Sequence, residues 1–324
     1  MTTLEGTSAQ ISVVVPLFNE EDNVEPMLDE LFAVLDGLDR SSEVICIDDG
    51  SSDATFEKLR RVAARRPSLS VLRFAKNYGQ TAALAAGFHT ATGEIVITID
   101  GDMQNDPADI SRLLEVFDSG YDIVSGWRKH RKDGFLLRTV PSRIANRLIS
   151  AITGVHLHDY GCTLKAYRRT LLQRFELYGQ LHRFIPALGA WAGGTVTEIE
   201  VNHRARQHGA SKYGIGRTTT VLLDLMVVKF LMSYGSHPIR VFGMAAMASW
   251  LLAFTALGAV IYMRLVPEPT VDMTGNPLLY LAMLGLMVGV QFLLMGILAE
   301  MQMRTYHEAQ GKRIYVIVER LNSD

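Results

Sequence analysis

Two carboxylates separated by one glycine follow a short apolar stretch of the chain. Residues 95–99 are β-prone and run directly into Asp100 and Asp102, and Gln104 follows two positions later. An apolar run of this length is typical of a strand that is buried on both faces of a parallel sheet. Such a strand delivers the residues after it to the carboxyl edge, where open α/β folds bind ligands. Because carboxylate and amide oxygens suit Mg²⁺ or Mn²⁺, we predict a divalent cation that holds a diphosphate there.

Two further polar pairs stand where predicted strands end. They are Asn19 with Glu20, after residues 11–16, and Asp48 with Asp49, after residues 43–47. In a parallel sheet these pairs should meet the Asp100 pair at one edge, where Asp48 or Asp49 could hydrogen-bond a base or a ribose. The simpler explanation for any one pair is a solvated loop acid or a helix cap. Three pairs in this arrangement favour a nucleotide site.

The first two hundred residues alternate between strand and helix patterns. We expect strands at 11–16, 43–47, 69–74, 95–99, 121–125 and 194–201. Four helices are expected between them. The first carries apolar Val24, Leu28, Leu31 and Leu35, and the second begins after a cap within residues 51–53. The third covers residues 79–91, and the fourth runs from Asp106-Pro107 to about Asp118. Alternation with short connections predicts βαβ units and a mainly parallel sheet, so the fold class is α/β.

Composition narrows the class of protein further. The 324 residues carry a net charge of −2, so no overall basic field indicates a nucleic-acid partner. The two cysteines are too few for a disulfide framework, and Cys46 lies in an apolar strand pattern. We therefore expect Cys46 to be a core residue in a reducing compartment. Residues 1–10 lack the pattern of a signal peptide, so the N-terminal part is expected in the cytosol.

Two long stretches near the C-terminus contain no charged residue. Residues 241–263 and 273–299 are each long enough to cross a hydrocarbon core, which needs about 20 residues. We predict a transmembrane hairpin with spans at about 241–263 and 277–299. Buried helices of a soluble protein are the alternative. Basic residues flank the hairpin on both sides, whereas its connection holds Arg264 alone, so the positive-inside rule places both flanks in the cytoplasm.

Several segments combine basic and apolar residues next to this hairpin. Residues 135–153 have apolar side chains four apart beside arginines, which is typical of an amphipathic helix at a membrane surface, although an ordinary surface helix fits equally well. Residues 221–234 are apolar but carry Asp224 and Lys229, which favours the membrane interface. We therefore divide the chain into a cytoplasmic domain at 1–215, an interfacial segment at 216–240, a hairpin at 241–299 and a cytoplasmic tail at 300–324.

Four motifs follow one another in the first domain. They are Pro16-Leu17-Phe18-Asn19-Glu20, Ile47-Asp48-Asp49-Gly50-Ser51-Ser52-Asp53, Lys76-Asn77-Tyr78-Gly79-Gln80 and Asp100-Gly101-Asp102-Met103-Gln104-Asn105-Asp106-Pro107. In this order they resemble the motifs of family 2 glycosyltransferases, which have the Rossmann-like GT-A fold. Two positions depart from many members. Met103 stands in place of Leu, and Lys76 in place of Arg, which keeps the charge but loses the bidentate fork.

Further motifs resemble one subgroup, the polyprenyl-phosphate glycosyltransferases. They are Asp159-Tyr160-Gly161-Cys162, Gln180-Leu181-His182-Arg183-Phe184 and Gly209-Ala210-Ser211-Lys212-Tyr213-Gly214, followed by the hairpin. This subgroup includes dolichyl-phosphate mannose synthases and bacterial undecaprenyl-phosphate glucosyl and aminoarabinosyl transferases. The resemblance covers nearly the whole chain. It implies inverting transfer of one sugar from a nucleotide-sugar to polyprenyl phosphate at the cytoplasmic face of the bacterial inner membrane.

The resemblance also implies roles for individual residues. The donor site would comprise Pro16, Asn19, Glu20, Asp48, Asp49, Lys76, Gly79, Asp100, Gly101, Gln180 and His182. The metal, Mg²⁺ or Mn²⁺, would be held by Asp100, Asp102 and Gln104, where it neutralises the departing diphosphate. The resemblance does not identify the sugar. It favours a UDP-sugar such as UDP-glucose, because the match leans toward the bacterial enzymes, and it leaves a homo-oligomer open.

The acceptor implied by the resemblance is a lipid phosphate, which is already mostly ionised at pH 7 and needs no strong general base. The catalytic residues implied are then Asp102, several positively charged side chains and one serine hydroxyl. Arg128, Arg138 and Ser142 would face the acceptor phosphate. Arg204 and Lys212 would clamp donor and acceptor phosphates, unless these cations serve only to attract anionic lipid headgroups.

The residue at position 182 helps to distinguish glycosyltransferases that use a phosphate acceptor from those that use a hydroxyl acceptor. Relatives that glycosylate a hydroxyl generally have an acidic base near this position, because an alcohol must lose its proton. Here the residue is His182, which we interpret as a ligand of the donor or of a phosphate, with a structural role as the alternative. Two other functions remain open at this point: a membrane glycosyltransferase acting on a hydroxyl of a glycolipid or polysaccharide, and a non-catalytic adaptor that binds nucleotide-sugar.

Overall fold

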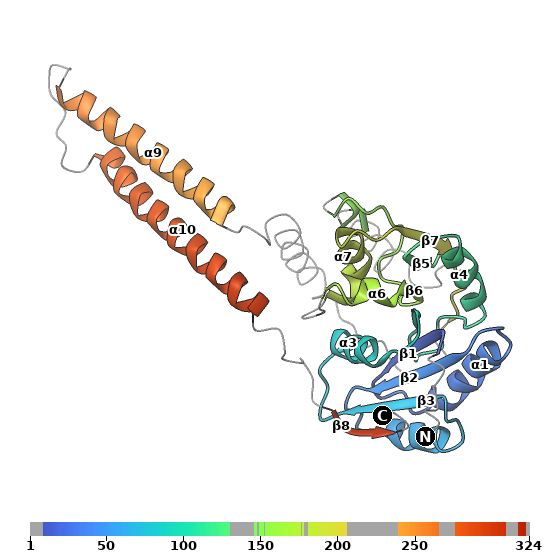
Figure 1. The fold of residues 1–324 in the computed structure, drawn as a ribbon. Helices are drawn as coiled ribbons and strands as arrows, with labels where there is room; N and C mark the ends of the chain where they lie inside the picture. Colours follow the sequence, from blue (N-terminus) through green and yellow to red (C-terminus); the bar gives the residue numbers. More distant parts are fainter. Residues whose placement is uncertain are drawn as a thin grey trace, which may run out of the picture. The chain divides into compact units, whose positions relative to one another are not determined.

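The computed structural model describes residues 9–129, 146–147, 149–151, 153–175, 177, 181–205, 239–265, 276–308 and 317–321. The chain divides into two compact units, Met1–Val228 with Arg313–Asp324, and Lys229–Lys312 (Figure 1). The segments predicted to be interfacial, residues 135–153 and 221–234, lie wholly or largely outside the described residues.

The first unit is built on one sheet with the strand order β7-β5-β6-β4-β1-β2-β3-β8. The strands are β1 (Ile11–Leu17), β2 (Ser42–Asp48), β3 (Leu69–Phe74), β4 (Ile95–Thr98), β5 (Ile123–Trp127), β6 (Lys165–Arg168), β7 (Val196–Glu200) and β8 (Ile317–Leu321). β6 pairs antiparallel with β4 and β5, and β8 pairs antiparallel with β3, while the remaining pairs are parallel. The predicted mainly parallel sheet is confirmed.

Helices cover both faces of this sheet. They are α1 (Val24–Asp36), α2 (Thr55–Ala63), α3 (Gln80–Thr90), α4 (Asp109–Asp118), α6 (Arg169–Leu172) and α7 (Ile185–Trp191), with a 3₁₀ turn η2 (Leu181–Phe184) before α7. The apolar faces of α1, α2 and α4 share one core cluster with alternate residues of β1, β2 and β4. α3 packs on the other face, where Gly87 lies against Val14 and Ile47. Cys46 is buried in the core as predicted.

One helix begins later than predicted. α4 begins at Asp109, three residues after the expected cap at Asp106, and no side chain caps its first turn. Asp106 instead accepts a hydrogen bond from the Ala108 N–H and forms an ion pair with Arg204, so its carboxylate closes a turn and contacts a distant loop. The cap expected for α2 within residues 51–53 contacts the start of that helix. Asp53 accepts the N–H of Thr55, the first residue of the helix.

β6 and β8 have no counterpart among the strands expected from the sequence. β6 has only four residues, and it inserts between β4 and β5 although it follows both in the chain. Its pairing with β4 joins Thr98 to Lys165. The segment before β6, residues 159–163, is thereby brought to the end of β4. This placement determines the site described below.

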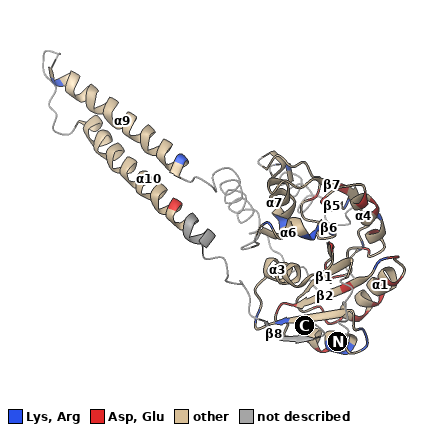
Figure 2. Ribbon diagram, viewed as in Figure 1, with Lys and Arg blue, Asp and Glu red and all other residues tan. Residues whose placement is uncertain are grey.

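The second unit contains two long apolar helices, α9 (Ile239–Leu265) and α10 (Pro277–Glu308). The candidate membrane spans, Ile239–Leu265 and Pro277–Gln302, have mean hydropathies of 1.9 and 2.3, and only 22% of each window is buried. Buried helices of a soluble protein would be mostly covered. In Figure 2 the charged residues of both helices lie only toward their ends. Both helices therefore have the length and composition of membrane spans, at the positions predicted.

Small residues allow α9 and α10 to pack closely. A Cβ added at Gly285 would lie 3.0 Å from the Cβ of Ala253, and one at Gly289 would lie 2.3 Å from Nε1 of Trp250. The Trp250 indole N–H also donates to the Leu286 carbonyl at 3.4 Å. Close approach through glycine is a common way for helices to associate in membranes.

The packing of α3 on the sheet predicts that Gly87→Ala destabilises the first unit. An added Cβ would lie 2.2 Å from Cγ1 of Val14 and 3.1 Å from Cδ1 of Ile47. We expect a net loss of about 1–3 kcal/mol, because overpacking outweighs the better helix propensity of alanine. Thermal unfolding followed by circular dichroism in detergent should show a Tm lower by roughly 2–12 °C. Gly37→Ala is the control, since its Cβ would meet nothing closer than 3.4 Å, and an equal Tm for both variants would contradict this packing.

Candidate functional site

The three polar pairs singled out in the sequence lie along one edge of the sheet. β4, β1 and β2 are neighbours and run parallel, and each pair stands at or after the carboxyl end of its strand. The register pairs Leu17 with Asp48 across β1 and β2. The edge predicted from the sequence is therefore formed by the fold.

Hydrogen bonds from side chains hold the loops after β1 and β2 together. Asn19 has a left-handed backbone conformation with φ 49°, which is uncommon outside glycine. Its N–H donates to Oγ of Ser51 at 2.9 Å, and its Oδ1 accepts the N–H of Ser52 at 2.8 Å. The Glu20 N–H donates to Oγ1 of Thr55. The strained conformation of Asn19 is thus maintained by contacts with the neighbouring loop.

Asp49 organises a third loop. Its carboxylate accepts the N–H of Tyr78 at 2.7 Å and the N–H of Gly79 at 2.8 Å, on the connection between β3 and α3. Gly79 has φ 93°, a conformation that favours glycine. Burial raises the pKa of Asp49, while these two hydrogen bonds favour the ionised form. Of the two acids expected to contact a nucleoside, Asp49 is therefore engaged with the backbone.

Asp48 is fully buried at the end of β2. Its Oδ1 accepts the N–H of Ser51 at 3.0 Å, whereas no described residue hydrogen-bonds its Oδ2. The guanidinium of Arg73 lies 3.6 Å from that oxygen. Burial raises the pKa of the Asp48 carboxyl. Oδ2 of Asp48 is therefore compensated by the charge of Arg73 and not by a hydrogen bond from a described residue.

Asp100 is held from two sides at the end of β4. Its Oδ1 accepts a hydrogen bond from Nε2 of Gln80 at 2.9 Å, and its Oδ2 accepts one from Oγ1 of Thr163 at 2.6 Å. Burial raises the pKa of Asp100 to about 6, and the like charge of Asp102 adds to this rise. A buried carboxylate with a second negative charge beside it forms an environment that a cation would stabilise.

The donor set fits a hard divalent cation. Asp100, Asp102 and Gln104 offer carboxylate and amide oxygens, the ligand class preferred by Mg²⁺ and Mn²⁺. Within the described ranges no three His, Cys, Asp or Glu side chains gather as a closed metal cage. Such a site leaves coordination positions for the oxygens of a ligand. Gly101 is required here, because a Cβ would lie 2.5 Å from Cδ2 of Leu17.

Arg128 is paired with a residue to which the sequence assigned no role. Its Nε and Nη2 donate to the two oxygens of Asp159 at 2.7 and 3.0 Å, in bidentate geometry. The side chains are 12% and 5% exposed. Burial opposes the positive charge of Arg128, but attraction to Asp159 more than offsets this effect and raises the pKa of Arg128. The field of Arg128 also reaches Asp100 and lowers the pKa of that carboxyl.

Lys165, on β6, supports the same segment from within the core. Its ammonium donates to the carbonyl oxygens of Tyr160, at 3.3 Å, and of Cys162. Burial lowers the pKa of Lys165. Residues 159–163 therefore connect Arg128, through Asp159, to Asp100, through Thr163. The sequence motifs contained Gln80 and Asp159, but nothing in the pattern indicated Thr163 or Lys165, because β6 was not expected.

Arg204 lies where the loop after β7 returns toward the Asp100 loop. Its guanidinium pairs with Glu30 at 2.6 Å and with Asp106 at 2.8 Å, and its N–H donates to the Gln104 carbonyl at 2.8 Å. Arg204 thus ties its loop to residues 104–106. Four other predicted site residues lie outside the described part of the chain. They are Arg138, Ser142, Gln180 and Lys212.

His182 joins η2 to α3 beside the site. Its Nδ1 shares a hydrogen bond of 2.8 Å with Oγ1 of Thr81, the neighbour of Gln80. Burial lowers the pKa of His182 to about 3, helped by the positive charges of Arg183 and Lys165. The imidazole is therefore neutral at physiological pH. Of the remaining predicted donor residues, Pro16 is half-buried and Lys76 lies over the Tyr78 ring, 5.3 Å from its centroid.

A family model supplies the decisive comparison. The model described as glycosyl transferase family 2 matches residues 12–175, which contain β1 to β6 and the whole acid edge. This chain belongs to glycosyl transferase family 2. The expected family and the enzyme class, a glycosyltransferase, are confirmed.

Two curated relatives of this family 2 chain match nearly its full length. A protein of Rhizobium johnstonii named dodecaprenyl-phosphate galacturonate synthase is 42% identical over 317 residues, which cover 96% of this chain and 92% of the relative. A protein of Aeromonas hydrophila named undecaprenyl-phosphate 4-deoxy-4-formamido-L-arabinose transferase is 37% identical over 308 residues, covering 95% and 92%.

Solved structures confirm the fold of this glycosyltransferase. Glucosyl-3-phosphoglycerate synthase of Mycobacterium tuberculosis, in complex with Mn²⁺, UDP and its product, has a TM-score of 0.52 at 20% identity. The match covers 68% of this chain and 80% of that one. The same enzyme with Mg²⁺ and UDP has a TM-score of 0.53 at 19% identity. The likeness shows the expected GT-A-like arrangement.

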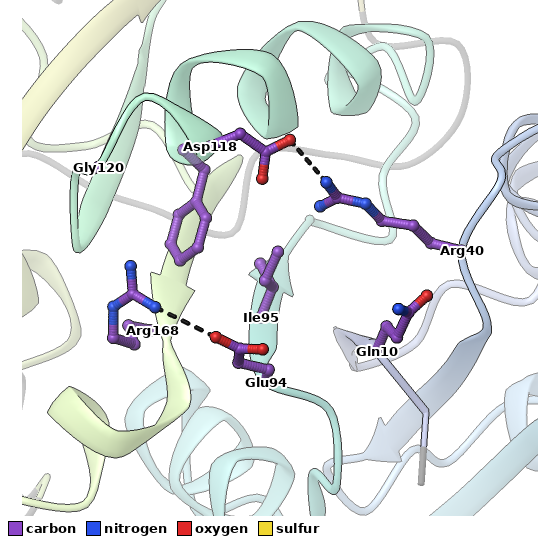
Figure 3. Close-up of a pocket in the computed structure, with 8 residues that line it drawn as sticks. Gln10, Arg40, Glu94, Ile95, Asp118, Gly120 and Arg168 are labelled. Atoms are coloured by element: carbon purple, nitrogen blue, oxygen red, sulfur yellow. Dashed lines mark hydrogen bonds and ion pairs between the residues drawn. The ribbon is translucent and has the colours of Figure 1, made fainter. Parts of the chain in front are cut away.

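A separate pocket lies at the opposite edge of the glycosyltransferase sheet, beside the amino ends of β1 and β4. It has a volume of about 300 Å³ and is shown in Figure 3. Two ion pairs cross its wall, Arg40 with Asp118 at 2.6 Å and Arg168 with Glu94 at 3.2 Å. Since its charges neutralise each other and lie away from the acid edge, we assign it no role in the reaction.

The buried pair predicts that Asp159→Ala strongly destabilises the enzyme, because it leaves Arg128 charged and uncompensated. Breaking such a pair costs about 3–5 kcal/mol, so Tm should fall by roughly 6–20 °C in a detergent melt. Asp36→Ala is the matched control, since its ion pair with Arg66 is exposed and such pairs contribute about 0–1 kcal/mol. Equal Tm values for the two variants would show that the Arg128–Asp159 pair is not structurally important.

His182 predicts a specific dependence of stability on pH. Its folded pKa is about 3 and its ordinary pKa is 6.5, so the unfolded state binds more protons between these values. The contribution of His182 to stability is complete above pH 6.5 and is lost as pH falls toward 3. We expect the Tm of the wild type to drop more between pH 6.5 and 5 than that of His182→Asn. Parallel Tm curves over this range would rule out a buried neutral imidazole.

Proposed function

We propose that this enzyme transfers one sugar, with inversion, from a nucleotide-sugar to polyprenyl phosphate at the cytoplasmic face of a membrane. The observation that carries the proposal is the carboxyl edge itself, where Gln80 and Thr163 hold Asp100 close to Asp102 and where the charge of Arg128 reaches the same carboxylate. This edge combines a cation site with a nearby guanidinium. Such a combination is suited to joining an anionic donor and an anionic acceptor.

The donor half of the proposal rests on the three loops that surround the acid pair. Asn19, Asp48 and Asp49 bring the loops after β1, β2 and β3 into one rigid edge. Asp48 is fully buried and ion-paired with Arg73, so it supports this edge from within. The structural neighbours with UDP support a uridine nucleotide. The sugar is left to experiment, because the two relatives are named for galacturonate and for formamido-arabinose, and UDP-glucose is the third candidate.

Asp100, Asp102 and Gln104 would hold Mg²⁺ or Mn²⁺. When bound, the cation supplies Lewis-acid stabilisation of the negative charge on the departing diphosphate. Gln80 and Thr163 orient Asp100, and the compact Gly101 lets this loop approach Leu17. These contacts keep the carboxylates in place whether or not the substrate is bound.

Two features support polyprenyl phosphate as the acceptor. They are the position of Arg128 and the fact that a phosphate acceptor needs no general base. Asp159 engages Nε and Nη2 of Arg128, so the Nη1 side of the guanidinium can donate to an acceptor phosphate. A phosphate monoester is mostly ionised at pH 7, and His182, with a pKa of about 3, is too weak a base to take a proton from an alcohol, which is consistent with a reaction that removes no proton. The names of both relatives support polyprenyl phosphate as the acceptor. Arg138, Ser142 and Lys212 are proposed to bind phosphates as well. Arg204 would do so by exchanging its ion pairs with Glu30 and Asp106 for a phosphate.

The hairpin of α9 and α10 is proposed to anchor the enzyme beside its lipid substrate. Basic residues flank both spans, while the connection carries Arg264 alone. By the positive-inside rule, the catalytic unit and the C-terminus then lie in the cytoplasm. An anchored enzyme meets a membrane-bound acceptor and a soluble donor at one interface.

The test is a donor screen on the purified full-length protein with undecaprenyl phosphate and Mg²⁺ or Mn²⁺. UDP-glucose, UDP-galacturonate, a UDP-amino-arabinose and GDP-mannose are compared, and the products are read by mass spectrometry. We expect one donor to yield polyprenyl-phosphate-sugar. Transfer to a glycolipid hydroxyl instead of the phosphate would refute the acceptor, and no transfer with any donor would favour a binding protein.

Asp102→Ala tests the metal site in the same assay. Losing a metal ligand should lower turnover at least about 100-fold and weaken Mn²⁺ binding to the protein alone, measured by electron paramagnetic resonance. Asp36→Ala, at an exposed position on α1, should change neither quantity. Unchanged Mn²⁺ affinity in Asp102→Ala would refute this ligand assignment.

A further inference from the structure

His158 stands directly before Asp159, the residue that holds the guanidinium of Arg128. Its side chain is 66% exposed, yet three parts of the first unit fix the residue in place. They are the strands β5 and β7 and the segment at residues 146–147. An exposed side chain normally keeps its rotamer freedom, and ordering it costs free energy. The fixation of an exposed residue at this position therefore points to a role beyond packing.

Glu198, on β7, holds both the backbone and the ring of His158. One of its carboxylate oxygens accepts the His158 N–H at 2.9 Å, and the other accepts a hydrogen bond from Nδ1 of the imidazole. Only 15% of the Glu198 side chain is exposed, so this double contact is largely shielded from water. Hydrogen bonds to a carboxylate are stronger than those between neutral groups. Glu198 thus fixes the chain immediately before Asp159.

Two further contacts restrain His158. The indole of Trp127, the last residue of β5, stacks on the imidazole with ring centroids 4.3 Å apart and 18° between the ring planes. Nδ2 of Asn146 donates to the His158 carbonyl at 2.6 Å. Trp127 immediately precedes Arg128 in the chain. The residue before the guanidinium and the residue before its carboxylate partner are therefore in direct contact.

These contacts leave Asp159 little freedom. Lys165 holds the carbonyls on the C-terminal side of Asp159, and Glu198 holds the chain on its N-terminal side. An aspartate side chain has only two torsions, so a fixed backbone restricts its carboxylate to a few positions. Because Asp159 occupies the Nε and Nη2 groups of Arg128, the same restriction sets the direction of the remaining Nη1 group.

We propose that His158 and Glu198 are positioning residues for the reaction, which orient the guanidinium of Arg128 toward the acceptor phosphate. This inference rests on the function proposed above, in which the Nη1 side of Arg128 binds that phosphate. Neither positioning residue contacts the phosphate in this role. Glu198 fixes His158, the fixed chain holds Asp159, and Asp159 directs the guanidinium. Small misplacements of a binding group weaken catalysis, since the reacting groups must be held close to their productive geometry.

The dependence of the rate on each substrate tests the proposal in full-length Glu198→Ala. The polyprenyl phosphate concentration that gives half-maximal rate should rise roughly 3- to 10-fold, as expected when one or two hydrogen bonds that orient the site are lost. The corresponding concentration of nucleotide-sugar should stay close to that of the wild type. Glu198→Gln keeps an oxygen that can accept the His158 N–H, so its value should lie between the two. Equal rises for both substrates would overturn the proposal, as would no rise for polyprenyl phosphate.

Glu200→Ala is the matched control. Glu200 lies two residues further along β7, on the same face, and carries the same charge, but it forms its ion pair with Lys129. Both variants remove one negative charge from the same strand, so a difference between them reports the contact with His158. We expect Glu200→Ala to leave the use of polyprenyl phosphate unchanged. Equal effects of the two substitutions would overturn the proposal.

A double-mutant cycle tests whether Glu198 acts through Arg128. Arg128→Lys keeps a positive charge beside Asp159 but loses the planar fork whose direction Glu198 is proposed to set. Glu198→Ala should therefore raise the half-saturating concentration of polyprenyl phosphate much less in the Arg128→Lys background than in the wild type. Independent effects of the two substitutions, which would multiply, would overturn the positioning role.

Direct binding separates this inference from the proposed function. Farnesyl phosphate, a short polyprenyl phosphate, is titrated into each full-length protein in detergent with UDP and Mn²⁺, and binding is followed by calorimetry. Failure of the wild type to bind would overturn the acceptor assignment and this inference with it. Full retention of binding in Glu198→Ala would overturn the positioning role alone. Binding that is weakened in Glu198→Ala and retained in Glu200→Ala would support both.

Discussion

The site depends on keeping two carboxylates, Asp100 and Asp102, next to each other at the end of a buried strand. Burial and like-charge repulsion both disfavour ionisation of Asp100 and raise its pKa to about 6. Neighbouring side chains offset part of the cost of ionising Asp100. Thr163 and Gln80 donate to the carboxylate, and the positive charges of Arg128 and Lys165 lower its pKa. The arrangement is suited to a cation, which would remove the repulsion altogether.

The segment of residues 159–163 is the physical link between these groups. Asp159 holds Arg128, Thr163 holds Asp100, and Lys165 holds the carbonyls between them. One short segment therefore positions a guanidinium and a carboxylate together. A buried lysine is costly in a core. Here its hydrogen bonds to two carbonyl oxygens offset part of that cost and restrict the segment to one conformation.

The two units of the chain are stabilised by different kinds of interaction. The first unit concentrates charge at a sheet edge, which requires a rigid network of polar contacts such as those of Asn19 and Asp49. In the second unit, residues 241–263 and 277–299 carry no charge, and the two helices pack through glycine, as helices do where lipid provides no hydrophobic driving force between them.

Much of the fold and of the candidate site could be predicted from the sequence alone, because local residue patterns encode them. Apolar runs followed by Asn19, Asp48 and Asp100 predicted parallel strands that share a carboxyl edge, and two uncharged stretches predicted the hairpin. The family was recognisable from short motifs. The tertiary structure decided what each side chain contacts. β6 is too short to have a pattern, yet its pairing with β4 brings Thr163 and Lys165 to the site. Likewise, Asp49 binds backbone N–H groups from a loop about thirty residues away, and Asp159 pairs with Arg128. These contacts arise from strand order and loop return, and no local spacing encodes them.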